Sequence, residues 1–293
     1  MQFHKTHFSL CDDGNKRIIA YFDGSCLHGG LVDRLKGIVS LYEISIKLNI
    51  PLKINFTSPF LLNDYLTISP IFLASEGDLK WALTSTKIIN AINITDNKLE
   101  YDIASSAQKH LACYSNMDYV NNKSIWKNHF YTLFSPTKKL NDELDAYNDL
   151  NYDLAFHTRF TSLLGDFKDV SKKKISFEQE KILMDQVKNT IINRIKINGV
   201  ESASVFSDSK KFLAYLKEDE KHSALFTILD NKIPEHSDRL DSSNDGHLKT
   251  FVDFFLLSRF NKIELIQHGE MYSSAFSKYA SIIGNSTFTI INN

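Results

Sequence analysis

The sequence predicts an α/β protein in which short buried strands alternate with amphipathic helices. Residues 17–56 contain a strand, a loop, a helix and a second strand, and short apolar runs alternate with helical patterns after residue 153. The 11 glycines and 5 prolines in 293 residues are too few for a turn-rich all-β chain or a disordered one. Such alternation implies a mostly parallel sheet with helices on both faces.

The first half begins with a strand at 17–22, a helix at 31–48 and a strand at 52–56. The helix gives the clearest signal, because its apolar residues recur every three or four positions, at Leu31, Leu35, Ile38, Leu41, Ile44 and Leu48. Between residues 60 and 130, short apolar runs are mixed with Asn-rich turns, and no element is predicted there.

A polar segment separates the two halves. Ser135-Pro136-Thr137 has the composition of a helix start, and the polar helix predicted to follow it extends to Asp149. We therefore expect two domains, residues 1–150 and 151–293. The second is predicted to hold strands at 153–157, 202–206, 224–229, 263–267 and 286–291, and helices at 177–196, 209–217, 246–260 and 272–283.

Charge and composition exclude several classes of partner. A formal net charge of −1 provides no strong field for nucleic acid or anionic lipid. No apolar run reaches the ~20 residues of a membrane span, and the first eight residues do not form a signal peptide. Cys11, Cys26 and Cys113 lack metal-ligand spacing and indicate reduced thiols. A cytoplasmic protein is expected, with peripheral attachment to the inner membrane left open.

The loop before the first helix has the composition of an anion site. Gly29 and Gly30 would let the backbone approach a ligand, the helix start offers free N–H groups, and Arg34 and Lys36 add cations. An ordinary tight turn with solvated charges explains the same residues, and local sequence alone favours that interpretation.

A strand that ends in a fixed cation is the most informative feature of the second half. The run to Phe156 ends in His157 and Arg159, and Gly165-Asp166 follows. Arginine stays charged and can hold two phosphate oxygens at once. A buried strand-end histidine beside a surface arginine is the alternative.

Two further helix starts carry small polar residues. Asp208 lies between Ser207 and Ser209 at a strand end, and Ser273, Ser274 and Ser277 begin a later helix. All of these residue types cap helices well. Asp208 could also accept hydrogen bonds from a base or ribose, and the serines could donate to phosphate. The chain has no Asp-x-Asp at a strand end, no Walker loop, no Gly-x-Ser-x-Gly and no Gly-x-Gly-x-x-Gly, so no metal site is predicted.

In this order, the segments resemble the fucosyltransferase superfamily, which includes nodulation-type α1,6-, bacterial α1,2- and protein O-fucosyltransferases. The resemblance rests on Gly29-Gly30-Leu31-x-Asp33-Arg34-Leu35, His157-x-Arg159, Phe206-Ser207-Asp208, Phe251-x-Asp253-Phe254 and Ser273-Ser274-x-Phe276-Ser277. The chain departs from many bacterial members, which continue His-x-Arg directly into Arg-Gly-Asp. Here Gly165-Asp166 comes several residues later.

The resemblance implies a GT-B glycosyltransferase with two Rossmann-like domains facing across a cleft. The first domain would serve the acceptor and the second a GDP-sugar donor, GDP-fucose, without metal and with inversion. The implied donor-binding residues are Gly29, Gly30, Arg34, His157, Arg159, Asp208, Ser273, Ser274 and Ser277. The implied catalytic residues are Arg159, Asp166 and Asp33, with His28 a further candidate for the base.

Two other functions fit the same residues. One is a GT-B transferase that uses another nucleotide sugar, such as a UDP-sugar. The other is a non-catalytic protein that binds a sugar nucleotide or a glycan, since fold alone does not fix function. The expected acceptor is a glycan hydroxyl in bacterial surface-polysaccharide or lipopolysaccharide synthesis, which no residue identifies.

Overall fold

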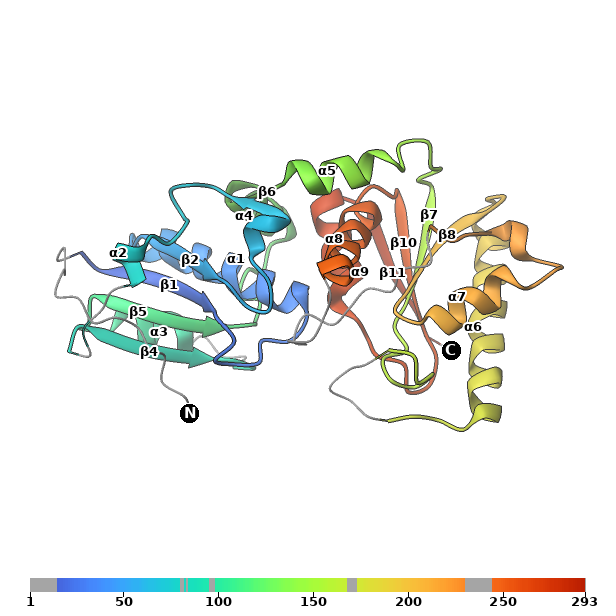
Figure 1. The fold of residues 1–293 in the computed structure, drawn as a ribbon, viewed down its shortest axis with the longest axis horizontal. Coiled ribbons are helices and arrows are strands. Elements are labelled where there is room, and N and C mark those ends of the chain that lie inside the picture. Colours follow the sequence, from blue (N-terminus) through green and yellow to red (C-terminus); the bar gives the residue numbers. More distant parts are fainter. Residues whose placement is uncertain are drawn as a thin grey trace. The chain divides into compact units, whose positions relative to one another are not determined.

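A computed structural model of the protein describes residues 15–79, 82, 84–94, 98–167, 173–229 and 244–292. Cys11 lies outside these residues. The chain forms two compact units, and among the described residues the first extends to Lys139 and the second begins at Leu140 (Figure 1). This division falls at the start of the polar helix that was predicted to connect the two halves. Within the described residues, no helix has the length and apolar character needed to cross a membrane.

The first unit is built on a four-stranded parallel sheet of order β2-β1-β5-β4. The predicted strands β1 (Arg17–Phe22) and β2 (Leu52–Phe56) and the predicted helix α1 (Leu31–Leu48) are confirmed. The region without predicted elements contains η1 (Leu62–Asp64), β3 (Leu66–Ile68), α2 (Glu76–Leu79), β4 (Thr86–Ala91), α3 (Lys98–Ala104), β5 (His110–Ser115) and α4 (Lys123–Leu133).

Helix α1 packs tightly against the end of β5. It begins after Gly30, whose N–H donates to the Asp33 carboxylate at 3.2 Å, and it ends at Asn49 in the left-handed conformation, with φ 52°. Gly37 makes the close approach possible, because a Cβ added there would lie 2.0 Å from the carbonyl oxygen of Ser115. The loop before α1 is thereby held at the carboxyl end of the sheet.

The helix predicted to follow Ser135-Pro136-Thr137 is present, but Ser135 and Pro136 do not form its start. These residues belong to β6 (Phe134–Pro136), which pairs antiparallel with β3, and the Thr137 N–H donates to the Tyr65 carbonyl at 3.0 Å. Pairing with β3 holds this stretch extended, so helix α5 begins only at Lys138 and ends at Asp145.

The second unit is a five-stranded parallel sheet of order β11-β10-β7-β8-β9. Its strands are β7 (Leu154–Thr158), β8 (Ala203–Ser207), β9 (Phe226–Thr227), β10 (Lys262–Gln267) and β11 (Thr287–Asn292). Its helices after α5 are α6 (Phe177–Asn198), α7 (Lys210–Lys217), η2 (Ser223–Leu225), α8 (Asn244–Leu257) and α9 (Ala275–Gly284). All five predicted strands and four predicted helices are present, although the strand expected at 224–229 is shortened by η2 to two residues.

The strand order has a functional consequence. Counted along the chain, the five strands have the spatial order 3-2-1-4-5, which is the Rossmann order, and it reverses between β7 and β10. In such sheets ligands bind outside the carboxyl ends of the strands at the point of reversal. The ends of β7 and β10 are therefore where a ligand is expected.

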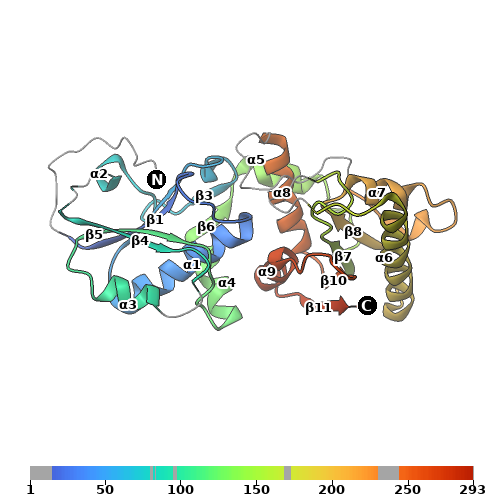
Figure 2. The ribbon, with the colours of Figure 1, turned by 90° about the horizontal axis from the view of Figure 1, so that it is seen from below.

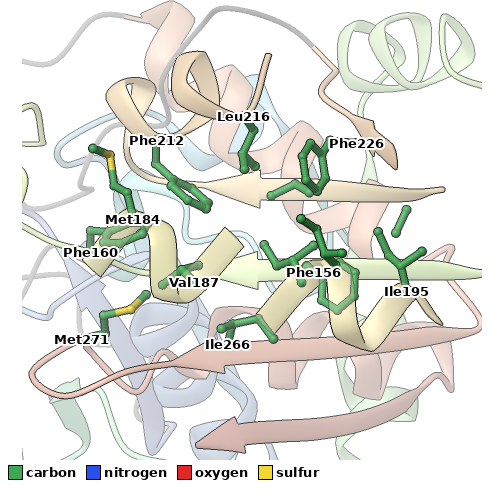
Figure 3. Packing of buried hydrophobic residues seen from close by; sticks show 14 of the residues in the cluster. Phe156, Phe160, Met184, Val187, Ile195, Phe212, Leu216, Phe226, Ile266 and Met271 are labelled. Atoms are coloured by element: carbon green, nitrogen blue, oxygen red, sulfur yellow. The ribbon is translucent and has the colours of Figure 1, made fainter. Parts of the chain in front are cut away.

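Helices cover both faces of this sheet (Figure 2). On one face α6 and α7 enclose an apolar core with Phe156, Val187 and Phe212 (Figure 3). On the other face α9 packs against β10 and β11, and α8 packs against α9. Side chains alternate along a strand, so Phe156 faces α6 whereas its neighbour His157 faces α9.

We expect Gly37→Ala to lower the free energy of unfolding by about 1–3 kcal/mol, because the new methyl group overlaps a backbone oxygen that cannot move alone. Gly77→Ala in α2 is the matched control, since a Cβ there would meet only Ser75 Oγ, at 3.6 Å. Urea denaturation of both variants measures the difference. Equal stability of the two would contradict the close packing of α1 on β5.

Candidate functional site

Two strand ends bring Arg159 and Asp208 together. Strands β7 and β8 are parallel, and Thr158 pairs with Ser207, so the next residue of each strand leaves the sheet at the same edge. Arg159 Nε lies 3.4 Å from Asp208 Oδ2. Arg159 and Asp208 therefore lie at one edge of one sheet, beside the reversal of strand order.

Arg159 is fixed from several directions. Its guanidinium lies over the ring of Phe167, 4.4 Å from the ring centre, and its carbonyl oxygen accepts a hydrogen bond from the Tyr272 N–H at 3.1 Å. The first contact comes from the loop after β7 and the second from the segment before α9. The side chain retains 17% of its exposure, so solvent still reaches it.

Asp208 is enclosed, with 2% of its surface exposed. Its Oδ1 accepts the N–H of Phe160 at 2.8 Å, and its Oδ2 accepts the N–H of Thr161 at 2.7 Å. Burial raises the pKa of Asp208 to about 6, and the Arg159 charge and the two backbone donors oppose that rise. These contacts are with the loop after β7, at the two residues that follow Arg159.

The His157 side chain lies on the α9 face of the sheet, opposite the apolar core that contains Phe156. Its Nδ1 is 3.0 Å from Ser277 Oγ, and its ring packs against Phe276. Burial, with a smaller contribution from the Arg159 charge, lowers the pKa of His157 to about 3. The imidazole is therefore neutral at physiological pH, and its contact with Ser277 ties the end of β7 to α9.

The three predicted serines have different surroundings. Ser274 caps α9, since its Oγ accepts the N–H of Phe276 at 3.2 Å. Ser277 is buried against His157, and Ser273 is exposed. Ser273 and Ser274 lie at the start of a helix that follows β10, which is where helix N–H groups can meet an anion.

Asp166 lies at the start of α7. Its Oδ2 accepts hydrogen bonds from Ser209 Oγ at 2.9 Å and from the Lys211 N–H at 2.7 Å. Ser209 in turn caps the helix through the N–H of Phe212 at 3.0 Å. The carboxylate thus has a structural role, and its predicted role as the base remains a prediction.

The glycine loop belongs to the first unit. Gly29 has φ +86°, and a Cβ there would lie 2.4 Å from Asp33 Oδ2, so both the conformation and the contact require glycine. Asp33 accepts from the Gly30 N–H and pairs with Lys36 at 2.6 Å. Arg34 is buried, donates to the Ser58 carbonyl at 3.1 Å and lies over the ring of Phe56.

His28 is enclosed among aromatic rings. It has no exposed surface, its Nδ1 lies 3.0 Å from the Cys26 carbonyl oxygen, and its ring contacts Phe22 and Tyr114. These contacts favour a packing role over that of a base.

Sequence reasoning missed the part played by the loop after β7. The N–H groups of Phe160 and Thr161 bind Asp208, and Thr161 adopts a left-handed φ of 54° that threonine seldom takes. No sequence signal predicts this conformation. Within the described ranges, no three His, Cys, Asp or Glu side chains are grouped closely enough to hold a metal ion.

Comparison of the fold with solved structures identifies fucosyltransferases. NodZ α-1,6-fucosyltransferase, from a crystal soaked with GDP-fucose, is 13% identical at a TM-score of 0.58, over 92% of this chain and 93% of that one. NodZ from Bradyrhizobium is 11% identical at a TM-score of 0.59, over 91% and 93%. The apo form of POFUT1 is 10% identical at a TM-score of 0.53, over 97% and 99%.

By sequence, no protein-family model and no curated protein matches the chain. At these identities the structural likeness establishes the fold. The predicted GT-B fold, with two Rossmann-like units, is confirmed, and the predicted resemblance to fucosyltransferases is confirmed at the level of the fold.

The buried neutral state of His157 predicts a pH effect on stability. The imidazole protonates near pH 6.5 when exposed but near pH 3 in the fold, so the unfolded chain binds the extra proton and stability falls as the pH drops below 6.5. We expect the stability difference between wild type and His157→Gln to shrink by about 2 kcal/mol from pH 7 to pH 5. Urea denaturation at both pH values measures it, and a pH-independent difference would refute the neutral buried ring.

Proposed function

We propose that the protein is a metal-independent, inverting glycosyltransferase that moves fucose from GDP-fucose to a glycan hydroxyl. The observation that carries this proposal is Arg159, held beside Asp208 at the reversal point of a Rossmann-order sheet. A fold shared with NodZ, a fucosyltransferase whose crystal was soaked with GDP-fucose, supports the choice of donor. GDP-fucose is the donor, and the protein has no resident cofactor.

The proposed chemistry requires stabilisation of a leaving diphosphate. The acceptor oxygen attacks the anomeric carbon from the face opposite the nucleotide, the bond to the β-phosphate oxygen breaks, and its electron pair stays on that oxygen. Arg159 can stabilise the growing charge, since its fork suits phosphate oxygens. The start of α9, with Ser273 and Ser274, adds N–H and O–H donors.

Neutral His157 contributes without adding charge. With Nδ1 against Ser277 Oγ, it fixes the end of β7 relative to α9, and so relates Arg159 to the serines at the helix start. Gly29, Gly30 and Arg34 are proposed to serve the donor from the first unit through the glycine loop. Arg34 would serve the donor indirectly, by holding that loop in place, since it is buried against Ser58 and Phe56.

The general base is proposed to be a carboxylate. Asp33 takes precedence over Asp166, because the Asp33 side chain is 33% exposed whereas Asp166 holds the start of α7. An acceptor hydroxyl must come within about 2.6–3.2 Å of the base in the reactive complex. The proton of the acceptor passes to this carboxylate as the new glycosidic bond forms.

The biological setting is also a proposal. We place acceptor binding in the first unit and donor binding in the second, in the cytoplasm or at the inner-membrane surface. The acceptor would be a bacterial surface glycan such as lipopolysaccharide. These assignments follow from resemblance to bacterial fucosyltransferases.

Nucleotide preference tests the donor. We expect GDP to raise the melting temperature with EDTA present, because a ligand at 100 times its Kd stabilises the folded protein by about 2.7 kcal/mol. UDP, CMP and ADP serve as controls. Stabilisation by UDP and not by GDP would show that the donor is wrong, while GDP binding without transfer to any acceptor would favour a non-catalytic binding protein.

Replacement of Arg159 tests the site itself. We expect Arg159→Ala to lower turnover about 10²–10³-fold while the protein stays folded, as when one donor to a developing oxyanion is removed. Arg159→Lys keeps the charge but loses the fork and should remain impaired. Arg259→Lys is the matched control, because Arg259 binds Leu144, Asn148 and Tyr152 away from these strand ends. Near-normal turnover in Arg159→Ala would remove the main support for the proposal.

A further inference from the structure

The loop after β7 and the turn after β8 are joined by two carboxylates, one from each segment, that each accept hydrogen bonds from the other segment. Asp208, at the end of β8, accepts N–H groups of the loop residues Phe160 and Thr161. In the other direction Asp166, in the loop, accepts Ser209 Oγ and the Lys211 N–H at the start of α7. Each segment thus holds the other through a charged side chain.

These hydrogen bonds fix the backbone next to Arg159. Asp208 binds the two residues that directly follow Arg159 and lies 3.4 Å from its Nε. The loop then passes through Thr161, with a left-handed φ of 54°, to Phe167, whose ring lies under the guanidinium. A threonine in that conformation costs energy, so the loop needs an external contact to hold it.

The oxygens of Asp208 are already engaged. Both accept a backbone N–H at 2.7–2.8 Å, one of them also faces Arg159, and the residue is 2% exposed. A side chain that contacts a base or ribose would have to present a free oxygen to the ligand. The geometry therefore does not favour the nucleotide contact that the resemblance implied for Asp208.

We propose that Asp208 is a positioning residue, which holds Arg159 and the loop behind it in the form that binds the diphosphate. The inference rests on the proposed function and deepens it. The loop is set before the donor arrives, so binding does not have to order the arginine. Asp208 thus acts on the phosphates through Arg159.

The charge on Asp208 is consistent with this role. Arg159 lies against it, Asp166 is the other carboxylate near it, and the two N–H donors reach it from the loop. Burial and Asp166 oppose its ionisation, while Arg159 and the N–H groups favour it. The charged carboxylate therefore depends on the contacts that fix the loop.

The test compares affinities for GDP and GMP, which differ only in the β-phosphate. We expect Asp208→Asn to weaken GDP binding about 10- to 100-fold, as for loss of charged hydrogen bonds, with GMP binding changed much less. In an Arg159→Ala background the same substitution should add little, because its effect passes through the arginine. Asp208→Glu, which keeps the charge, should recover part of the preference for GDP.

The matched control is Asp219→Asn. Asp219 also accepts two backbone N–H groups, from Lys221 and His222, and also pairs with a cation, Lys188, at 2.8 Å. It lies beyond the other end of α7, so its loss should leave both affinities unchanged. An equal effect of the two substitutions would reduce Asp208 to an ordinary structural residue and overturn the inference.

Other outcomes are equally informative. Equal loss of GDP and GMP affinity in Asp208→Asn, or a full additional loss in the Arg159→Ala background, overturns the positioning role. Wild-type protein that binds GDP no more tightly than GMP overturns the proposed function and this inference with it. If the variants do not fold, hydrogen exchange of the wild type decides, since the Phe160 and Thr161 amides must be protected before GDP is added.

Discussion

The pairing of β7 with β8 on one side and β10 on the other is the constraint on which the rest of the site depends. The register places Thr158 beside both Ser207 and Ile266, so three strands end together at one edge. Residues distant in the chain, Arg159, Asp208 and the segment before α9, meet there as a result. A change of register by one residue would send each side chain to the opposite face of the sheet.

Burial opposes the charged form of both His157 and Asp208, and their other contacts decide the outcome. His157 points to the α9 face and is kept neutral, whereas Asp208 is held by one cation and two N–H groups that offset much of the cost of burying its charge. Of the described side chains His157, Arg159 and Asp208, Arg159 is the one with both a permanent charge and solvent exposure. An anion that approaches this edge therefore meets the fixed positive charge of Arg159 beside a helix start.

The sequence predicted the second unit well because short strands alternate regularly with helices after residue 153. It failed between residues 60 and 130, where β5 is buried throughout yet is marked only by the short run Leu111-Ala112-Cys113-Tyr114 between His110 and Ser115. It also misread Ser135-Pro136, because pairing with β3 is a contact with a distant segment. Of the candidate site, Arg159 and its neighbour Asp208 could be predicted from strand ends, but the left-handed Thr161 and the ring of Phe167 beneath the arginine could not.

Capping and catalysis use the same residue types, so a sequence cannot separate them, whereas hydrogen bonds can. Asp33 and Asp166 both lie at helix starts, and each accepts a backbone N–H there. In each of them this bond engages Oδ2 in holding the helix start. A carboxylate with both oxygens on N–H groups, as in Asp208, is suited to fixing a neighbouring charge. A carboxylate that keeps solvent exposure, as Asp33 does, is better suited to receive a proton from an acceptor. The different roles of Asp208 and Asp33 therefore follow from the partners of their carboxylate oxygens.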